Sequence, residues 1–289
     1  MAVTTVRRRR TPKDPEGRMP LMDHLRELRN RAVKAGIFLV LGSILGWFLW
    51  SGWTEDVWKV GSFRGGIFGL LQQPILDAAH GKGSLITINF GQVGSAFDFA
   101  IKGAIWVGVI VSSPFWLWQF WAFITPGLTR KEKRYAVGFI GAAVPLFLMG
   151  AAIAYSVLPN AMKFLIGFTP ADGSNVIDAQ IYLSFCMRII LAFGLGFLLP
   201  VVLVGLNFAH LVSGKAIVKQ WRISVFLSFL FSALVTPTSD ITTMLLLALP
   251  LLVLFGIAMV ICVLNDRRRE KNSPEPDYGN LSDDEASTI

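Results

Sequence analysis

Charged residues are scarce in this chain of 289 residues. Asp, Glu, Lys and Arg together make up 16% of the sequence, whereas hydrophobic residues make up 53%. A soluble domain carries about 25% charged residues. The mean hydropathy of +0.56 agrees with this composition. A soluble globular fold is therefore excluded, and the sequence is that of a membrane protein.

Cysteine and histidine are rare as well. The two cysteines, Cys186 and Cys262, both fall in apolar runs, which predicts small core residues and no disulfide framework. The three histidines lie far apart in the sequence, and no HExxH motif is present. A zinc site is therefore not expected.

Motifs that support enzymatic chemistry are also missing. The sequence has no GxxxxGK[ST] loop for nucleotide phosphates and no G-x-S-x-G turn for a nucleophilic serine. Its apolar runs hold no aspartate pair and no row of carboxylates of the kind that ion-driven carriers place in the membrane. We therefore predict that the chain is not an enzyme and that it needs no cofactor or metal.

The sequence does have a series of long uncharged runs. A helix needs about 20 apolar residues to cross a bilayer core of about 30 Å. Six runs reach or approach this length: 35–54, 103–129, 135–162, 189–214, 223–239 and 241–265. The run from 223 is marginal, because the turn TPTSD at 236–240 leaves only 13 residues between Arg222 and the turn. We predict an all-α polytopic membrane protein with six transmembrane helices, which internal prolines kink into a curved wall.

The basic residues fit one orientation of these helices. If the N-terminus is cytoplasmic, most of the 27 Lys and Arg residues fall in the two tails and in the cytoplasmic connections. This is the positive-inside pattern, so both termini are predicted to be cytoplasmic. Membrane topology thus explains the net charge of +8 without a nucleic-acid partner.

Three regions follow from the distribution of charge. Residues 1–19 are predicted to be a disordered basic cytoplasmic tail, residues 20–264 the transmembrane core, and residues 265–289 a disordered cytoplasmic tail. Within the core, residues 65–79 (GGIFGLLQQPILDAA) are apolar but too short to span, which predicts a helix on the outer surface. Tryptophans predict the membrane interfaces, among them Trp50 on the outer side and Trp121 on the inner side.

A dense charged segment, MPLMDHLRELRNRAV at 19–33, precedes the first apolar run. Its apolar residues recur at helical spacing, which predicts an amphipathic helix that leads into the first span. Glu27 lies four residues before Arg31. From the residues alone, this segment is a solvated interfacial helix with a surface ion pair.

From HLRELRNR (24–31) onward, the sequence resembles the TatC family, the core component of the twin-arginine protein translocase. Three further blocks carry the resemblance: SSPFWLWQFWAFITPGLTRKEKR (112–134), YLSFCMRIILAFGLGFLLPVVL (182–203) and TPTSDITTMLLLALPLLVLFGI (236–257). The resemblance implies a six-span, glove-shaped receptor in the bacterial inner membrane. It also implies binding of twin-arginine signal peptides at the cytoplasmic face, self-association, assembly with the single-span proteins TatA and TatB, and export of folded proteins driven by the proton-motive force.

The resemblance assigns signal-peptide binding to Glu27 and Glu132, whose carboxylates would contact the arginines of the signal. A carboxylate and a guanidinium form bidentate, charge-assisted hydrogen bonds, which suit Arg better than Lys. Phe123 and Arg29 are implied beside the same site. From the residues alone, Glu132 instead pairs with a neighbouring base: Arg130, Lys133 or Arg134.

Other positions are related by the resemblance to transport or to partner helices: Pro74, Tyr155, Arg188, Leu198, Leu234, Val235, Thr236 and Asp240. Two of them depart from the family pattern. Leu198 stands where many relatives have a Glu or Gln that faces the concave cavity, and Arg188 stands where an apolar residue is common. A lone Arg in a membrane is costly unless it is paired or snorkels. We therefore expect Arg188 to face the cavity or the outer interface and to take over part of the polar role.

Two other functions remain open from the residues alone. A multispan solute carrier or channel would need a polar row in its spans, and these runs offer only Arg188. A structural membrane anchor of a complex would tolerate substitution of Glu27 and Glu132.

Overall fold

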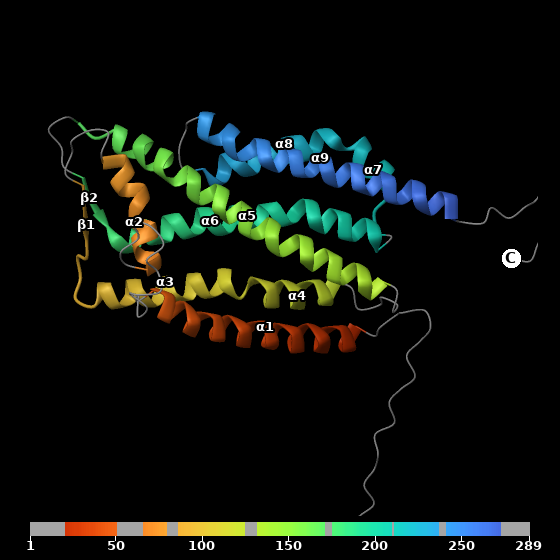
Figure 1. Cartoon of the computed structure of the whole chain (residues 1–289), viewed down its shortest axis with the longest axis horizontal. Helices are drawn as coiled ribbons and strands as arrows, with labels where there is room; N and C mark the ends of the chain where they lie inside the picture. The colour runs from red at the N-terminus through yellow and green to blue at the C-terminus, as the bar shows by residue number, and fades with distance from the viewer. Residues whose placement is uncertain are drawn as a thin grey trace, which may run out of the picture.

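A computed structural model of the chain describes residues 21–50, 66–79, 86–124, 132–170, 175–209, 211–236 and 241–272. These residues form helices and two short strands (Figure 1). In chain order the elements are α1 (Leu21–Trp50), α2 (Gly66–Ala79), β1 (Ile86–Asn89), α3 (Ser95–Val111), α4 (Ser113–Ile124), α5 (Glu132–Gly167), β2 (Asn175–Asp178), α6 (Ala179–Phe208), α7 (Gly214–Lys219), α8 (Trp221–Val235) and α9 (Ile241–Asn272).

Four helices are long and apolar enough to cross a membrane, namely α1, α5, α6 and α9. The pair α3–α4 forms a fifth such segment if it counts as one span, bent by 58° where the helices meet. Pro114 explains this break, because it lacks the N–H that would continue the helical hydrogen bonds. The prediction of an all-α polytopic membrane protein is confirmed. The count of six spans stays a prediction, because α8 has only 15 residues.

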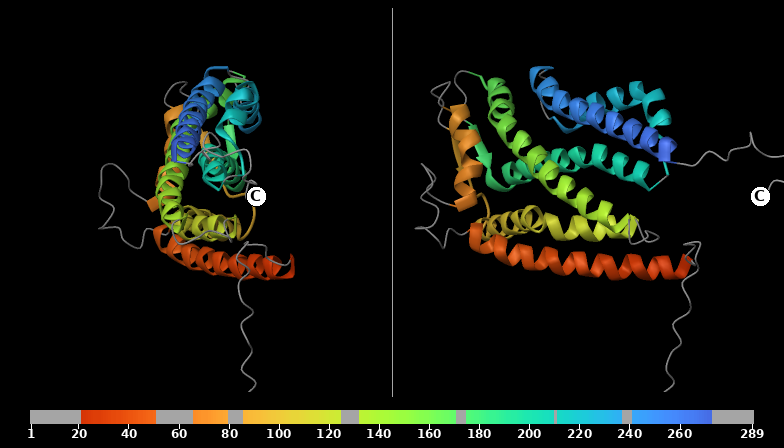
Figure 2. Two further views of the ribbon diagram at one scale, coloured as in Figure 1. Left: turned by 90° about the vertical axis from the view of Figure 1, so that its right-hand side faces the viewer. Right: turned by 45° about the vertical axis from the view of Figure 1, so that its right-hand side comes forward.

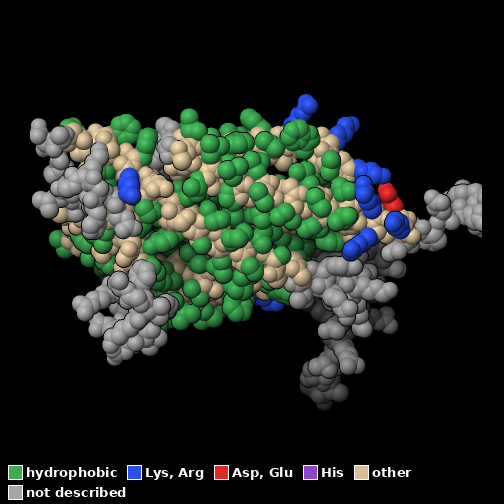
Figure 3. Space-filling model, turned by 45° about the horizontal axis from the view of Figure 1, so that its top comes forward, with side chains coloured by type: hydrophobic (Ala, Val, Ile, Leu, Met, Phe, Trp, Pro, Cys, Tyr) green, Lys and Arg blue, Asp and Glu red, His purple; other side chains and the backbone are tan. Residues whose placement is uncertain are grey.

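The two ends of the molecule differ. Helix α1 begins and α9 ends at one end, which we call the tail end (Figure 1). The opposite end, which we call the α2 end, carries α2 and the strands. There β1 and β2 pair in parallel, with Ile86 opposite Asn175. The sequence did not predict this small sheet. On the face shown in Figure 3, apolar side chains cover the middle, and Lys and Arg gather mainly at the tail end.

The helices pack in an open row. Helix α1 packs on α3 and α4, α5 packs on α4 and α6, and α9 packs on α6 and α8. Helix α1 and the α8–α9 pair therefore lie at opposite edges of the row (Figure 2). The main core lies where α5 and α6 meet, and its largest fully buried side chains include Phe147, Phe193 and Phe197. Cys186 and Cys262 are fully buried, as predicted.

Small residues bring α1 and α3 close together. A Cβ atom on Gly46 would lie 2.2 Å from the carbonyl oxygen of Ala104, and one on Gly108 would lie 2.5 Å from Cα of Ser43. Gly42 and Gly46 are four residues apart, so both face α3. Small residues at this spacing let membrane helices pack backbone against backbone. This contact holds the N-terminal helix on the bundle.

Polar residues extend the last helix past the predicted end of the transmembrane core. Helix α9 continues to Asn272, beyond the boundary at 264. Asp266 accepts hydrogen bonds from Nδ2 of Asn207 (2.9 Å) and from the backbone N–H of Gly214 (2.6 Å). Asn265 also donates from Nδ2 to Oδ1 of Asn207 (3.0 Å). These polar residues stay helical because they bind the turn between α6 and α7. Both predicted tails, 1–19 and the remainder after 272, lie outside the described residues.

We expect Asp266→Ala to lower the free energy of unfolding by about 2 kcal/mol, because it leaves buried N–H groups of Asn207 and Gly214 without an acceptor. Asn207 is only 2% exposed, so water cannot replace the lost contact readily. Thermal unfolding of the purified chain in detergent would measure the loss.

The matched control is Glu270→Gln on the same helix. Glu270 accepts from Nζ of Lys215 (2.8 Å), and this hydrogen bond raises the pKa of Lys215. Both side chains are exposed, so removal of this ion pair should change stability little. Equal stability of the two variants would contradict a structural role for Asp266.

Candidate functional site

A contact between α1 and α4 lies at the tail end. The ring of His24 on α1 stacks on the ring of Phe123 on α4, with centroids 4.7 Å apart and planes 22° apart. Both side chains are half-buried. Glu27 follows His24 by three residues and therefore shares its helical face. The structure thus brings two residues that the sequence related to the signal site, Glu27 and Phe123, onto one surface.

Glu27 already holds a guanidinium from its own helix. Nε and Nη2 of Arg31 both donate to Oε1 of Glu27, at 3.0 and 2.5 Å. The two side chains are 23% and 26% exposed, so water and ligands can reach them. Oε2 of Glu27 has no hydrogen-bond donor among the described residues. The carboxylate therefore combines an internal counter-ion with one open oxygen.

The other two residues implied for this site are placed less fully. Arg29 is exposed on α1. Glu132 is the first residue of α5, which begins at the tail end (Figure 1), but its side chain lies outside the described residues. Its contact with a neighbouring base or with the arginines of a signal peptide stays a prediction.

A second set of related residues meets at the α2 end. Pro74 lies inside α2 and is fully buried. Proline has no N–H, so the carbonyl four residues earlier, that of Leu70, loses its helical donor. The hydroxyl of Tyr155 on α5 donates to this oxygen at 2.8 Å. The resemblance relates Pro74 and Tyr155 to transport separately. In the structure they act together, because Pro74 leaves the carbonyl of Leu70 without a helical donor and Tyr155 donates to it.

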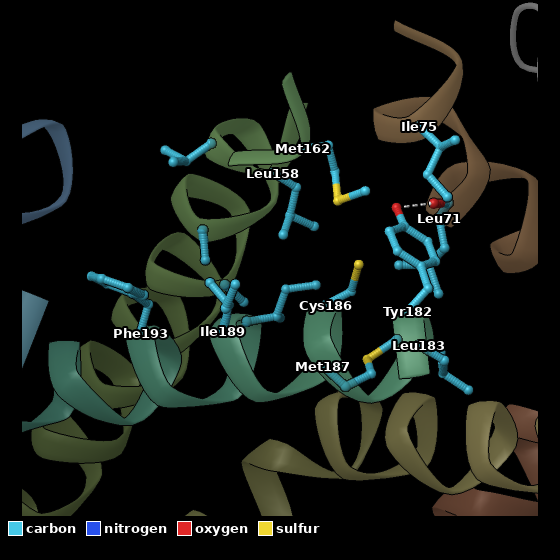
Figure 4. Close-up of a cluster of buried hydrophobic side chains, with 14 of the residues drawn as sticks. Leu71, Ile75, Leu158, Met162, Tyr182, Leu183, Cys186, Met187, Ile189 and Phe193 are labelled. Atoms are coloured by element: carbon cyan, nitrogen blue, oxygen red, sulfur yellow. Dashed lines mark hydrogen bonds between the residues drawn. The ribbon is translucent and has the colours of Figure 1, made fainter. Parts of the chain in front are cut away.

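Sequence reasoning missed a third member of this contact. The hydroxyl of Tyr182 on α6 donates to the carbonyl oxygen of Leu71 at 2.6 Å (Figure 4). Leu71 and Ile75 of α2 point into the same core as Leu158, Met162 and Leu183 (Figure 4). Helix α2 was predicted to lie on the membrane surface. The structure shows that its inner face is buried against α5 and α6 and that two tyrosines fix its position.

A cavity of about 650 Å³ opens between α6 and the end of α8. Arg188, Leu234 and Val235 are among its lining residues. Leu234 is 77% exposed, which makes it the most accessible of the residues related to partner helices. Thr236 is buried and donates from Oγ1 to the carbonyl oxygen of Ser232 (2.7 Å), so it closes the end of α8. Asp240 lies outside the described residues.

Leu198 does not face this cavity. It is 8% exposed and packs with Phe147 and Val201 in a core cluster between α4, α5 and α6. Burial of a leucine at this position stabilises the fold, whereas burial of a carboxylate would destabilise it. Arg188 lines the cavity and Leu198 does not; that Arg188 takes over part of the polar role stays a prediction.

Comparison with known proteins decides the family. The family model described as "Sec-independent protein translocase protein (TatC)" matches residues 23–250. The chain belongs to the TatC family. The family is one of protein translocases and not of enzymes, which agrees with the sequence prediction. With its apolar helices, this TatC-family chain is a multi-pass membrane protein.

Individual TatC proteins are similar over most of their length. The Sec-independent protein translocase protein TatC of Xylanimonas cellulosilytica is 43% identical over 256 residues, covering 89% of this chain and 88% of that protein. The TatC of Aquifex aeolicus is 32% identical over 256 residues, covering 88% and 98%. A crystal structure described as the twin-arginine translocase receptor TatC in DDM matches with a TM-score of 0.65 and 30% identity, covering 83% of this chain and 99% of that one.

Proposed function

We propose that this chain is the receptor and scaffold subunit of a twin-arginine translocase in a bacterial inner membrane. It binds Arg-Arg signal peptides at its tail end, assembles with TatA and TatB, and supports export of folded proteins with the proton-motive force. One observation carries the receptor role. Glu27 is an accessible carboxylate with an open oxygen, and the half-buried aromatic pair His24–Phe123 lies within a helical turn of it.

The tail end is the cytoplasmic face in this proposal. Helix α1 begins there and α9 ends there, with Arg and Lys in its last turn. Basic residues favour the cytoplasmic side of a membrane. The basic surroundings also repel free cations. A cationic ligand therefore binds tightly only where it contacts a carboxylate in good hydrogen-bond geometry.

In this proposal Glu27 binds a guanidinium of the signal in two steps. An arginine of the signal first donates to the open Oε2, then displaces Arg31 from Oε1 and forms a bidentate pair. The exposed edge of the His24–Phe123 stack offers a flat surface on which a guanidinium or an adjacent apolar side chain can rest. A lysine ammonium makes neither contact as well, because it is a point charge without a planar fork.

The exposed end of α8 is the proposed contact for a partner helix. Leu234 projects from this end, and α8 covers only part of α6, so apolar surface remains open beside it. A single-span protein such as TatA or TatB offers a helix of matching polarity. Self-association would use other surfaces of the row.

The test is a titration of membranes that contain the chain with two labelled signal peptides, one with Arg-Arg and one with Lys-Lys. We expect the Arg-Arg peptide to bind at least about tenfold more tightly, since a charge-assisted hydrogen bond contributes about 1.5–3 kcal/mol. Glu27→Gln should remove most of this preference. Glu132→Gln tests the second implied carboxylate in the same assay.

Asp23→Asn is the matched control, because it removes the same charge from the same helix. Asp23 only pairs with Arg26 in an exposed contact at 3.3 Å. This variant should keep the preference for Arg-Arg. Equal binding of both peptides to the unaltered chain would contradict the receptor role and favour a structural anchor.

A further inference from the structure

The cavity beside α8 arises from a difference in helix length. Helix α8 has 15 residues and α6 has 30, or about 22 Å against about 45 Å. Phe231 on α8 packs on Phe193 of α6, with ring centroids 5.6 Å apart. Helix α8 ends one turn later, so it does not cover the first three turns of α6. We call the uncovered part of α6 next to the end of α8 the step. The cavity lies at this step, and residues of both helices line it.

Arg188 is the only charged residue among those that line the cavity. Its guanidinium makes no ion pair or hydrogen bond with the described residues. Long side chains in a helix lean toward the helix N-terminus. For α6 this is the α2 end, so the guanidinium leans toward Ser184, one turn away. A cation in such an apolar wall is costly without a counter-ion, which points to an anionic ligand.

The cavity has a polar side and an apolar side. Gln180, Ser184 and Arg188 follow one another at intervals of four residues and form a polar strip on α6. At the α2 end of this strip, Nζ of Lys102 donates to Oε1 of Gln180 (2.8 Å), which adds a second cation nearby. Ile189 and Ala192 of α6 supply the apolar side, next to Leu234 of α8, whose exposed part the proposed function assigns to a partner helix. A ligand that matches both sides has an anionic head and a hydrocarbon tail.

We propose that this step binds an anionic phospholipid of the leaflet at the α2 end. The lipid phosphate pairs with Arg188 and accepts from Ser184, and an acyl chain lies along the apolar side. A zwitterionic headgroup fits less well, because Arg188 and the nearby Lys102 repel its cationic group and no carboxylate lines the cavity to balance it. The nearby Asp178 already accepts from the backbone N–H groups of Gln180 and Ile181.

Native mass spectrometry of the full chain, with phosphatidylglycerol or phosphatidylcholine added to the detergent, tests this proposal directly. We expect one phosphatidylglycerol molecule to bind preferentially. Arg188→Gln should weaken that binding at least fivefold and bring the two lipids to equal affinity, whereas Arg188→Lys should keep most of the preference. Thermal unfolding of each variant shows that it is folded.

The matched control is Lys163→Gln. Lys163 is an exposed cation on α5 that does not line the cavity, so its loss should leave phosphatidylglycerol binding unchanged. An unaltered preference in Arg188→Gln, or no preference in the unaltered chain, would overturn the proposal. Lipid binding is measured without signal peptides, so the result is independent of the receptor role.

A photo-crosslinker at Ile181 distinguishes a lipid from a protein occupant. Ile181 lines the cavity and is 72% exposed. In membranes of cells that produce the chain, we expect adducts with the mass of a phospholipid. A polypeptide adduct at this position would show that a partner helix fills the step, and it would overturn the lipid assignment.

Discussion

Replacement of Gly46 by alanine is expected to lower the free energy of unfolding by about 3 kcal/mol or more. Overpacking of a tight interface costs about 1–3 kcal/mol when side chains can yield. Here the added methyl group would lie 2.2 Å from the carbonyl oxygen of Ala104, which belongs to helix backbone and cannot turn away. The two helices must separate, and α1 loses its main contact with the bundle. Thermal unfolding in detergent measures the effect.

Gly36→Ala is the control for this experiment. Gly36 lies on the same helix, and a Cβ atom there would meet nothing within 4 Å. Alanine favours a helix over glycine by up to about 1 kcal/mol, so this variant should be at least as stable as the unaltered chain. If both variants unfolded at the same temperature, the close contact between α1 and α3 would not exist as described.

The same substitution should also impair peptide selectivity. Helix α1 carries His24 and Glu27, whereas Phe123 comes from α4. Separation of α1 from α3 and α4 would move the carboxylate away from the aromatic pair, although Gly46 itself touches no ligand. Loss of the preference for Arg-Arg in Gly46→Ala, together with retention in Gly36→Ala, is the expected result.

Loss of both hydroxyls that fix α2 is the second large effect. We expect Tyr155→Phe combined with Tyr182→Phe to cost about 2–3 kcal/mol. The carbonyl oxygen of Leu70 loses its donor, because Pro74 offers none, at a cost of about 1–3 kcal/mol. The carbonyl oxygen of Leu71 keeps the helical N–H of Ile75 and loses one net hydrogen bond, which contributes about 1 kcal/mol. Chemical or thermal unfolding of single and double variants gives the two contributions.

Pro74→Ala provides an internal test of this contact. Alanine at position 74 regains an N–H that can bond to the carbonyl of Leu70, so Tyr155 should matter less in this background. Tyr182 binds the next carbonyl and should keep its effect. A double-mutant cycle therefore predicts coupling of Pro74 with Tyr155 and weaker coupling with Tyr182. Equal coupling for both tyrosines would contradict the explanation.

The sequence was sufficient for features that depend on local pattern. Apolar length predicted the long helices, the internal prolines predicted bends in them, and the apolar stretch at 65–79 predicted α2. Features that depend on distant partners were missed. Tyr182 donates to a carbonyl 111 residues away in the sequence. Strand β1 pairs with β2, and α3, α4 and α5 lie between these strands in the sequence. No local pattern contains such pairs.

Two kinds of side chain have packing roles that the sequence did not predict, because the same residue type serves two environments. Trp50 and Trp121 were predicted to mark membrane interfaces, which stays a prediction, and both are buried in the bundle. Asp266 looked like part of a polar tail, yet it binds the turn before α7. By contrast, Gly42 and Gly46 at a spacing of four carry a readable signal for close packing of helices. The sequence predictions did not use this signal, and the structure identifies α3 as the facing helix.

The open row of helices has a consequence for symmetry. Its two edges, α1 and the α8–α9 pair, differ in shape and sequence. A contact between copies that joined one edge to the other would be heterologous, and such contacts close into a ring only when each copy turns by a fixed fraction of a circle. The number of copies in that ring would then follow from the angle between the two edges. Substitutions at Gly42 or Gly46, which move α1, would then change the stoichiometry together with the signal site that α1 carries.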